Sequence, residues 1–208
     1  LSLTESLKAL KTDYIDVFML HYADLEILEI DELYEVFEEL SKEGLIRYPG
    51  ISVYEEKETK RALDKGFWSV LQLPFNLMDQ KQGVHFQKAH ENGVGLVIRS
   101  VLMRGLLTDK SFQLHPELKA VENHIQLYKQ LFDSEMESLV ALAMKFTASI
   151  PEIASVLVGF DKIAFVDQAL EIFNGKNLNE DQLKLAKSLS YPDQGFLNLA
   201  KWDKNGWL

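Results

Sequence analysis

Strand-like and helix-like segments alternate five times along this chain, and this order constrains the fold more than any other feature of the sequence. The strands are expected at residues 14–21, 46–52, 68–76, 94–102 and 153–160. Each is followed by a segment with the apolar spacing of an amphipathic helix. Repeated strand–helix units predict a parallel sheet covered by helices, either as an open doubly wound sheet or as part of an eight-stranded barrel.

The helices are expected where apolar residues recur at helical spacing. They are residues 2–11, 31–43, 55–66, 81–93, 116–146, 163–174 and 179–190. Asp31 is expected to cap the second helix at its start and Gly44 to end it. The charged run at residues 55–61 is expected to be a solvated helix face.

Composition limits the class of protein. A chain of 208 residues with 47% apolar residues is long enough for one core, so residues 1–208 are expected to form one domain or a large part of one. A net charge of −10 argues against nucleic acid or an anionic membrane as the partner. The absence of cysteine, of a membrane-length apolar run and of a leader segment predicts a cytoplasmic protein.

Two kinds of motif are missing from the sequence. Neither a GxGxxG nor a GxxxxGK[ST] pattern follows any expected strand, which disfavours the nucleotide-binding open sheets and favours the barrel. No HExxH pattern or cluster of ligands indicates a metal. The reacting groups of a barrel lie where strands end, so polar residues at those positions are the candidates.

Those candidates each have two interpretations. The run "DYIDVFMLHYAD" at 13–24 predicts a strand covered on both faces that ends on His21, and a lone histidine there is more often structural than catalytic. Gln72, inside an apolar strand, either bonds the backbone or faces a ligand. Arg99 and Arg104 belong either to a solvated loop or to a phosphate site. Ser52 and Ser100 are small donors at strand ends, and either of them alone would be interpreted as a turn residue.

Five segments of the chain carry a recognisable family pattern. They are "SLKALKTDYIDVFMLH" at 6–21, "EELSKEGLIRYPGIS" at 38–52, "VLQLPFNLMDQ" at 70–80, "VIRSVLMRGLL" at 97–107 and "EIASVLVGF" at 152–160. They resemble the aldo-keto reductases, a family of NAD(P)H-dependent (β/α)8 barrels. The resemblance runs in order from residue 2 to about residue 170. It implies that residues 1–208 are the C-terminal portion of a single barrel domain, an incomplete barrel of strands four to eight with a C-terminal helix.

The resemblance also implies roles for particular residues. His21 matches the histidine that orients the substrate carbonyl, and Ser52 and Gln72 match groups that hold the nicotinamide carboxamide of NADP(H) or NAD(H). The loop after the seventh strand and the segment from Gly159 to Gln168 match the pyrophosphate and adenosine sites. The cofactor-binding residues expected on this basis are Ser52, Gln72, Arg99, Ser100, Leu102, Arg104, Gly159 and Gln168.

Four positions depart from the family pattern. Val53 replaces the asparagine beside Ser52, and Arg99 replaces the aromatic ring that stacks on the nicotinamide. Phe165 and Ala169 replace basic and amide residues around the adenosine ribose. The resemblance therefore leaves open the choice between NADH and NADPH and the strength of cofactor binding.

The family's aspartate, acid tyrosine and lysine lie on its first three strands, which have no counterpart in these residues. Tyr22 is a poor replacement because adjacent strand residues face opposite sides. The first hypothesis is a truncated or partly observed copy of a reductase for an aldehyde or ketone, inactive as this chain alone and completed by the N-terminal half of the barrel. The second is a degenerate binding or assembly module that pairs with another copy, and a third is an unrelated phosphate-binding barrel.

Overall fold

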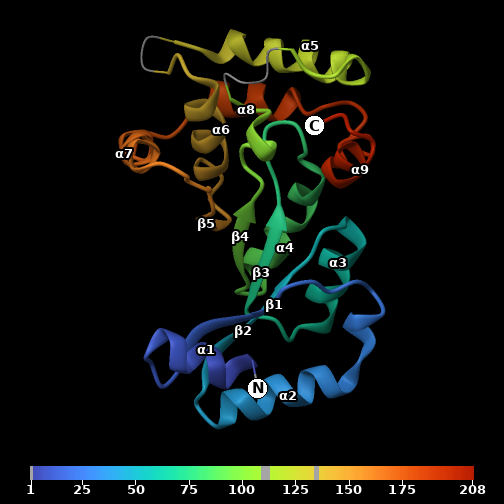
Figure 1. The fold of residues 1–208 in the computed structure, drawn as a ribbon, viewed down its shortest axis with the longest axis vertical. Coiled ribbons are helices and arrows are strands. Elements are labelled where there is room, and N and C mark those ends of the chain that lie inside the picture. The colour runs from blue at the N-terminus through green and yellow to red at the C-terminus, as the bar shows by residue number, and fades with distance from the viewer. Residues whose placement is uncertain (1, 109–112, 134–135) are drawn as a thin grey trace. The chain divides into compact units, whose positions relative to one another are not determined.

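The computed structural model describes residues 2–108, 113–133 and 136–208 (Figure 1). Its strands are β1 Ile15–Leu20, β2 Ile46–Ser52, β3 Val70–Pro74, β4 Gly95–Arg99 and β5 Ile153–Val156. Its α-helices are α1 Ser2–Leu10, α2 Asp31–Lys42, α3 Glu56–Lys65, α4 Phe86–Glu91, α5 Lys119–Leu127, α6 Leu139–Ala148, α7 Ile163–Ile172, α8 Glu180–Ser188 and α9 Leu199–Lys204. Short 3-10 helices cover Ile27–Glu29, Lys81–His85, Met103–Gly105, Pro116–Leu118 and Tyr128–Leu131.

The strands form one sheet in the order β1-β2-β3-β4-β5, which confirms the expected strand–helix alternation. β1 pairs in parallel with β2, and β2 with β3, so Ser52 stands beside Gln72 at the carboxyl ends. Backbone bonds continue this pattern, because the Phe75 amide donates to Arg99 just beyond β3 and the Leu157 amide donates to Ile98 just beyond β5. The carboxyl ends of successive strands therefore meet their neighbours in register.

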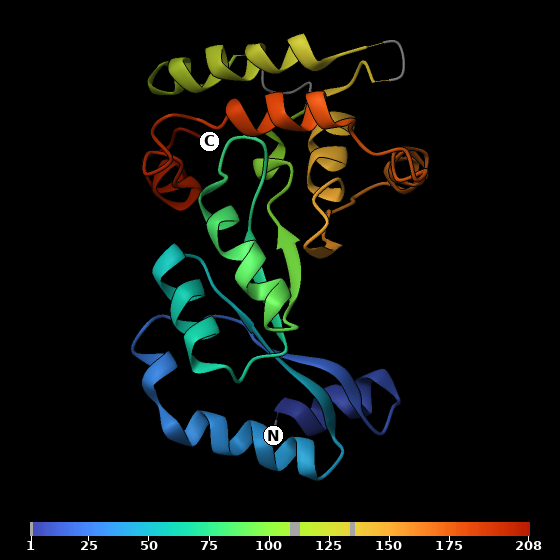
Figure 2. The ribbon, with the colours of Figure 1, turned by 180° about the vertical axis from the view of Figure 1, so that it is seen from behind.

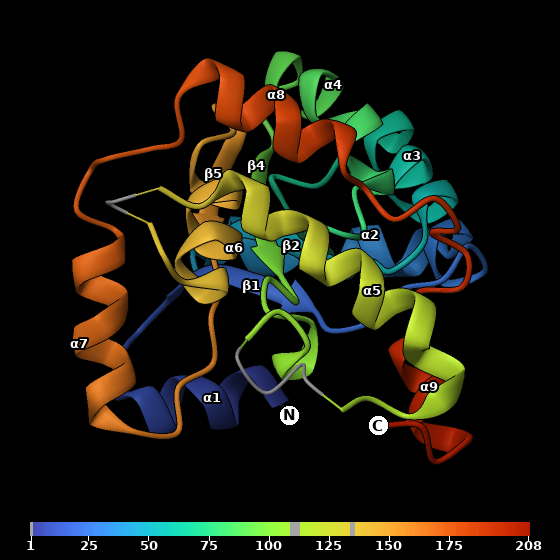
Figure 3. The ribbon, with the colours of Figure 1, turned by 90° about the horizontal axis from the view of Figure 1, so that it is seen from above.

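The chain divides into two compact units. Unit 1 comprises Leu1–Leu73 with Val84–Val97, and unit 2 comprises Pro74–Gly83 with Ile98–Leu208. β3 and β4 both pass from unit 1 into unit 2. Within unit 2, α5 and α8 lie side by side, whereas α7 stands at the margin next to α6 (Figures 2 and 3). In the described part of the chain, no helix is both long and apolar enough to span a membrane.

Unit 1 has an aromatic and aliphatic core around the fully buried Leu71. Trp68 is 3% exposed, and its ring lies 5.2 Å from that of Phe37. The charged run at 55–61 is not wholly solvated as expected, because Glu58 is buried. Its carboxylate accepts hydrogen bonds from the backbone amides of Tyr54 and Glu55 and so caps the start of α3.

Two local expectations in unit 1 are wrong. β1 is not covered on both faces: Asp16 and Val17 are exposed, because β1 is an edge strand of the sheet. Asp31 is not the cap of α2, since Ile30 holds that position without a side-chain cap bond. Asp31 instead begins the helix, where its charge favours the positive end of the helix dipole.

Unit 2 corrects the single long helix expected at residues 116–146. The chain forms the α-helices α5 and α6 there, with a short 3-10 helix on each side of α5. A short antiparallel bridge between Asp133 and Met136 separates α5 from α6, and Ser138 is the N-cap of α6. α6 contributes Phe146 to the core of unit 2. This side chain is fully buried and stacks on Phe75, with 5.6 Å between the ring centroids. β5 is also shorter than expected, since it ends at Val156.

Candidate active site

Parallel register gathers one group of polar side chains at the strand ends of unit 1. The Ser52 hydroxyl donates to Gln72 Oε1 at 3.3 Å, and Gln72 Nε2 donates to the sulfur of Met19 at 3.8 Å. Ser52 is only 3% exposed, whereas Gln72 is half-buried. Neither side-chain bond of Gln72 goes to the backbone, so its amide is held in place by side chains from β2 and from β1. Val53, which follows Ser52 in the chain, is fully buried.

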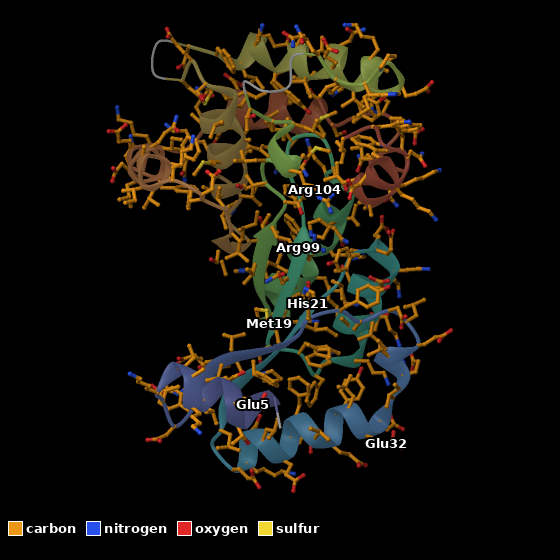
Figure 4. All side chains as sticks on the ribbon, viewed as in Figure 1. Glu5, Met19, His21, Glu32, Arg99 and Arg104 are labelled. Carbon is orange, nitrogen blue, oxygen red and sulfur yellow. The ribbon has the colours of Figure 1, made fainter. Side chains whose placement is uncertain are left out.

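His21 lies directly after β1 and is exposed (Figure 4). The turn that follows is fixed by Asp24, whose carboxylate accepts the Ile27 amide at 2.9 Å. Tyr22 also lies beyond the strand, and its ring packs against Tyr54 with the centroids 5.4 Å apart. Lost hydration raises the pKa of the Tyr22 hydroxyl, and the Glu58 and Asp24 carboxylates raise it further. Tyr22 is therefore a weaker acid than an ordinary tyrosine.

A strained turn follows β4 in unit 2. Ser100, Met103 and Arg104 all have left-handed backbone angles, with φ of 62°, 46° and 54°. The amide of Asn76, which is 2% exposed, donates to the Ser100 carbonyl at 3.2 Å, and Arg99 Nη1 donates to the Ser100 hydroxyl at 3.2 Å. These bonds hold Ser100 in a conformation that residues other than glycine adopt rarely.

A cavity of about 580 Å³ lies against this turn, wholly within unit 2. Its walls are the turn at 100–105, Thr108, the start of α6, the segment 157–161 and α7. The structure thus brings together five of the residues that the sequence predicts for cofactor binding, namely Ser100, Leu102, Arg104, Gly159 and Gln168. Arg99 is placed behind Ser100 instead of on the wall, and Ser52, Gln72 and His21 belong to unit 1.

Sequence reasoning missed other parts of the wall. Part of the wall comes from α6 and its N-cap, through Ser138, Val140 and Met144. The sequence analysis predicted one long helix across this region and so did not identify where α6 begins. Asp161 also lines it; the resemblance places it within the segment from Gly159 to Gln168 without singling it out. A serine before the apolar run of α6 is a helix-start signal that could have revealed this boundary.

The donor set of the cavity fits part of a dinucleotide. Arg104 supplies a forked cation suited to phosphate, and Ser100, Thr108 and Ser138 carry hydroxyls. The remaining wall is largely apolar, which suits an adenine ring, and the volume falls within the range of roughly 300–1,000 Å³ for small-molecule sites. No atom lies within 4 Å of the position that a Cβ on Gly159 would take, so the wall is open there.

Across residues 2–108, 113–133 and 136–208, no three histidine, aspartate or glutamate side chains are grouped so as to hold a metal ion.

Comparison with known proteins places this geometry in context. The sequence model of the aldo/keto reductase family matches residues 1–190. The chain is 30% identical over 198 residues to the uncharacterized oxidoreductase YqkF of Bacillus subtilis, covering 91% of this chain and 64% of that protein. It is 25% identical over 225 residues to L-glyceraldehyde 3-phosphate reductase of Escherichia coli O157:H7, covering 95% of this chain and 64% of that protein.

A solved structure gives the same result. The aldo-keto reductase AKR11C1 from Bacillus halodurans, in its holo form, superposes with a TM-score of 0.77 at 26% identity, covering 93% of this chain and 66% of that one. The chain therefore spans slightly less than two thirds of the length of these relatives, which is consistent with a partial barrel. With its family match over 190 residues and its five-stranded α/β sheet, this chain belongs to the aldo/keto reductase family.

Proposed function

We propose that this chain contributes the dinucleotide-binding part of an NAD(P)H-dependent reductase that converts an aldehyde or ketone into an alcohol. The observation that carries the proposal is the cavity of unit 2, because Ser100, Leu102, Arg104, Gly159 and Gln168 all line it. Family membership gives the reaction class, since the relatives named above are an oxidoreductase and an aldehyde reductase. Arg104 would bind the pyrophosphate, and the apolar wall would take the adenosine.

The strand-end group of unit 1 serves the reacting end of the cofactor in this proposal. Ser52 and Gln72 would bind the nicotinamide carboxamide, for which their hydroxyl and amide are suitable donors and acceptors. The bound nicotinamide supplies a hydride. His21, exposed at the end of β1, would donate a hydrogen bond to the carbonyl oxygen and so orient the substrate.

Hydride transfer to a carbonyl also needs a proton at the oxygen. Tyr22 does not fit that task, because its pKa is raised and its ring is packed against Tyr54. We therefore assign the proton to the acid tyrosine of the family's earlier strands, in the whole protein. Residues 1–208 alone are expected to bind the cofactor without turning it over.

Carbonyl-dependent oxidation of NADH or NADPH by the protein produced from its own gene tests this function. We expect turnover with small aldehydes, and we expect His21→Gln to lower kcat roughly tenfold or more while the dinucleotide Kd stays unchanged. Glu32→Gln, a change at an exposed glutamate on α2, is the matched control and should leave both values unaltered. Dinucleotide oxidation that needs no carbonyl compound would contradict the proposal.

A second candidate is an assembly role, favoured by the apolar surface of α7. Ile163 is 83% exposed and Leu170 is 69% exposed, and Phe165 and Val166 are exposed beside them. We propose that a second copy of the chain covers this surface. Light scattering on residues 1–208 at micromolar concentration tests this role, since a dimer that Leu170→Glu converts to a monomer supports self-association and a stable monomer argues against it.

A further inference from the structure

The charges around the cavity of unit 2 are few. Among the described residues that line it, Arg104 carries the positive charge and Asp161 carries the negative charge. The other described lining residues are neutral, including Phe165, Gln168 and Ala169 on α7. The formal charges of this described wall therefore cancel.

The single lining cation already has an acidic neighbour. Arg104 Nη1 lies 3.5 Å from an Asp203 carboxylate oxygen, and both side chains are more than half exposed. The pyrophosphate of any bound dinucleotide brings two further negative charges that Arg104 must balance. A dinucleotide with an additional phosphate on its ribose adds about −1.5 to −2 more at pH 7. The described wall has no second cation for that group.

We infer that Asp161 makes this cavity selective for a dinucleotide with a free ribose 2′-hydroxyl, that is NAD(H) in preference to NADP(H). A carboxylate accepts a hydrogen bond from a ribose hydroxyl, and it repels a 2′-phosphate. Dinucleotide folds of another class discriminate with an acidic residue in the same chemical way. This inference rests on the proposed function, because it presumes that the cavity takes the adenosine end.

Lys162 is the cation that could oppose this selectivity. It follows Asp161 directly and occupies the N-cap position of α7 without a side-chain cap bond, and its ammonium lies 5.6 Å from the centroid of the Phe165 ring. Phe165 lines the cavity, whereas Lys162 does not. The ammonium is thus close to the wall but engaged with the face of a ring. A substitution at Lys162 separates its influence from that of Asp161.

The experiment measures Kd for NADH and for NADPH by isothermal titration calorimetry of the chain and three variants. For the unaltered chain we expect NADH to bind roughly tenfold more tightly than NADPH or better. Asp161→Asn should narrow that ratio severalfold by strengthening NADPH binding. Lys162→Gln should leave the ratio unchanged, and so should the control Glu171→Gln, which removes an exposed α7 carboxylate that does not line the cavity.

The outcomes separate the two claims. If both dinucleotides bind with equal affinity, or if NADPH binds more tightly and loses that advantage in Lys162→Gln, the inference is overturned while the proposed function stands. If neither binds at millimolar concentration, the proposed function fails and the inference fails with it. Asp161 is exposed, so circular dichroism is expected to show an unchanged fold in Asp161→Asn.

Discussion

The strand ends of unit 1 and the cavity of unit 2 position their polar groups by different means. In unit 1, Ser52 and Gln72 are neighbours because parallel register places them side by side, and their side chains bond each other. In unit 2, Ser100 reaches the cavity through a left-handed backbone that Asn76 holds from the neighbouring strand end. Regular pairing therefore fixes the first group, whereas a strained loop fixes the second.

The side chains of the two regions should differ in how easily a substitution displaces them. A side chain fixed by strand register moves only if the sheet itself changes, and the sheet has a buried core. A side chain on a left-handed turn depends on a few specific bonds and on the helices packed behind it.

The largest effect is expected from the core behind the cavity. Phe146→Ala removes a fully buried ring that stacks on Phe75, and should lower the free energy of unfolding by about 3–5 kcal/mol. Val166→Ala, on the exposed face of α7, should cost well under about 1 kcal/mol. Urea unfolding measures both values. A loss below about 1 kcal/mol for Phe146→Ala would mean that α6 does not support the cavity wall.

The next effect concerns the cation of the cavity. Arg104→Met should weaken binding of ADP-ribose roughly tenfold or more, because a charge-assisted bond to phosphate is worth about 1.5–3 kcal/mol. Arg47→Gln changes an exposed arginine of unit 1 that pairs with Asp16, and should leave the affinity unaltered. Calorimetric titration measures both. Equal weakening in the two variants would point to a general charge effect.

A smaller effect separates the two regions by ligand. Ser52→Ala removes the hydroxyl that bonds Gln72, and should weaken NADH binding by roughly two- to tenfold, the value of about one ordinary hydrogen bond. Binding of ADP-ribose, which lacks the nicotinamide, should be unchanged in this variant. If NADH and ADP-ribose lose affinity equally in this variant, Ser52 and Gln72 do not bind the nicotinamide. The strand ends and the cavity would then not bind different parts of the cofactor.

The smallest effect concerns acid stability in unit 1. Hydrogen bonds from Arg61 lower the pKa of Glu29 to about 2, from an ordinary 4.5. The stabilisation from this lowered pKa is fully present above the unfolded value and is lost as the pH falls toward the folded value. Glu29→Gln should therefore show a shallower fall of Tm between about pH 5 and pH 2. An unchanged slope would show that this exposed ion pair contributes nothing to stability.

The sequence predicted the sheet and the strand-end residues because both follow from local patterns. Apolar runs identified all five strands, and β2 ends at Ser52 as expected. The placement of β1 as an edge strand depends on the sheet order, which residue periodicity does not contain. The sequence predicted one helix in place of α5 and α6, because apolar spacing continues across the bridge between Asp133 and Met136.

The cavity shows the same limit. Arg104 and Gly159 were predicted as site residues from motifs in the chain, and they line one cavity. Met144 was not predicted, and Asp161 was predicted only as part of the segment from Gly159 to Gln168, because a wall built from a loop and two helices depends on tertiary packing. Asn76 was overlooked for a similar reason, since its bond to Ser100 joins residues 24 positions apart.

Titration of ADP-ribose into the chain and into Gly159→Trp tests whether the cavity of unit 2 binds the adenosine end of a dinucleotide. Gly159 has open space at its Cβ position and its φ is outside the left-handed range, so a large side chain should enter the cavity without straining the backbone. We expect one-to-one binding to the unaltered chain and its loss in the variant, with the same Tm. If the two proteins bind ADP-ribose with equal affinity, or if neither binds it, the cavity of unit 2 is not the adenosine site.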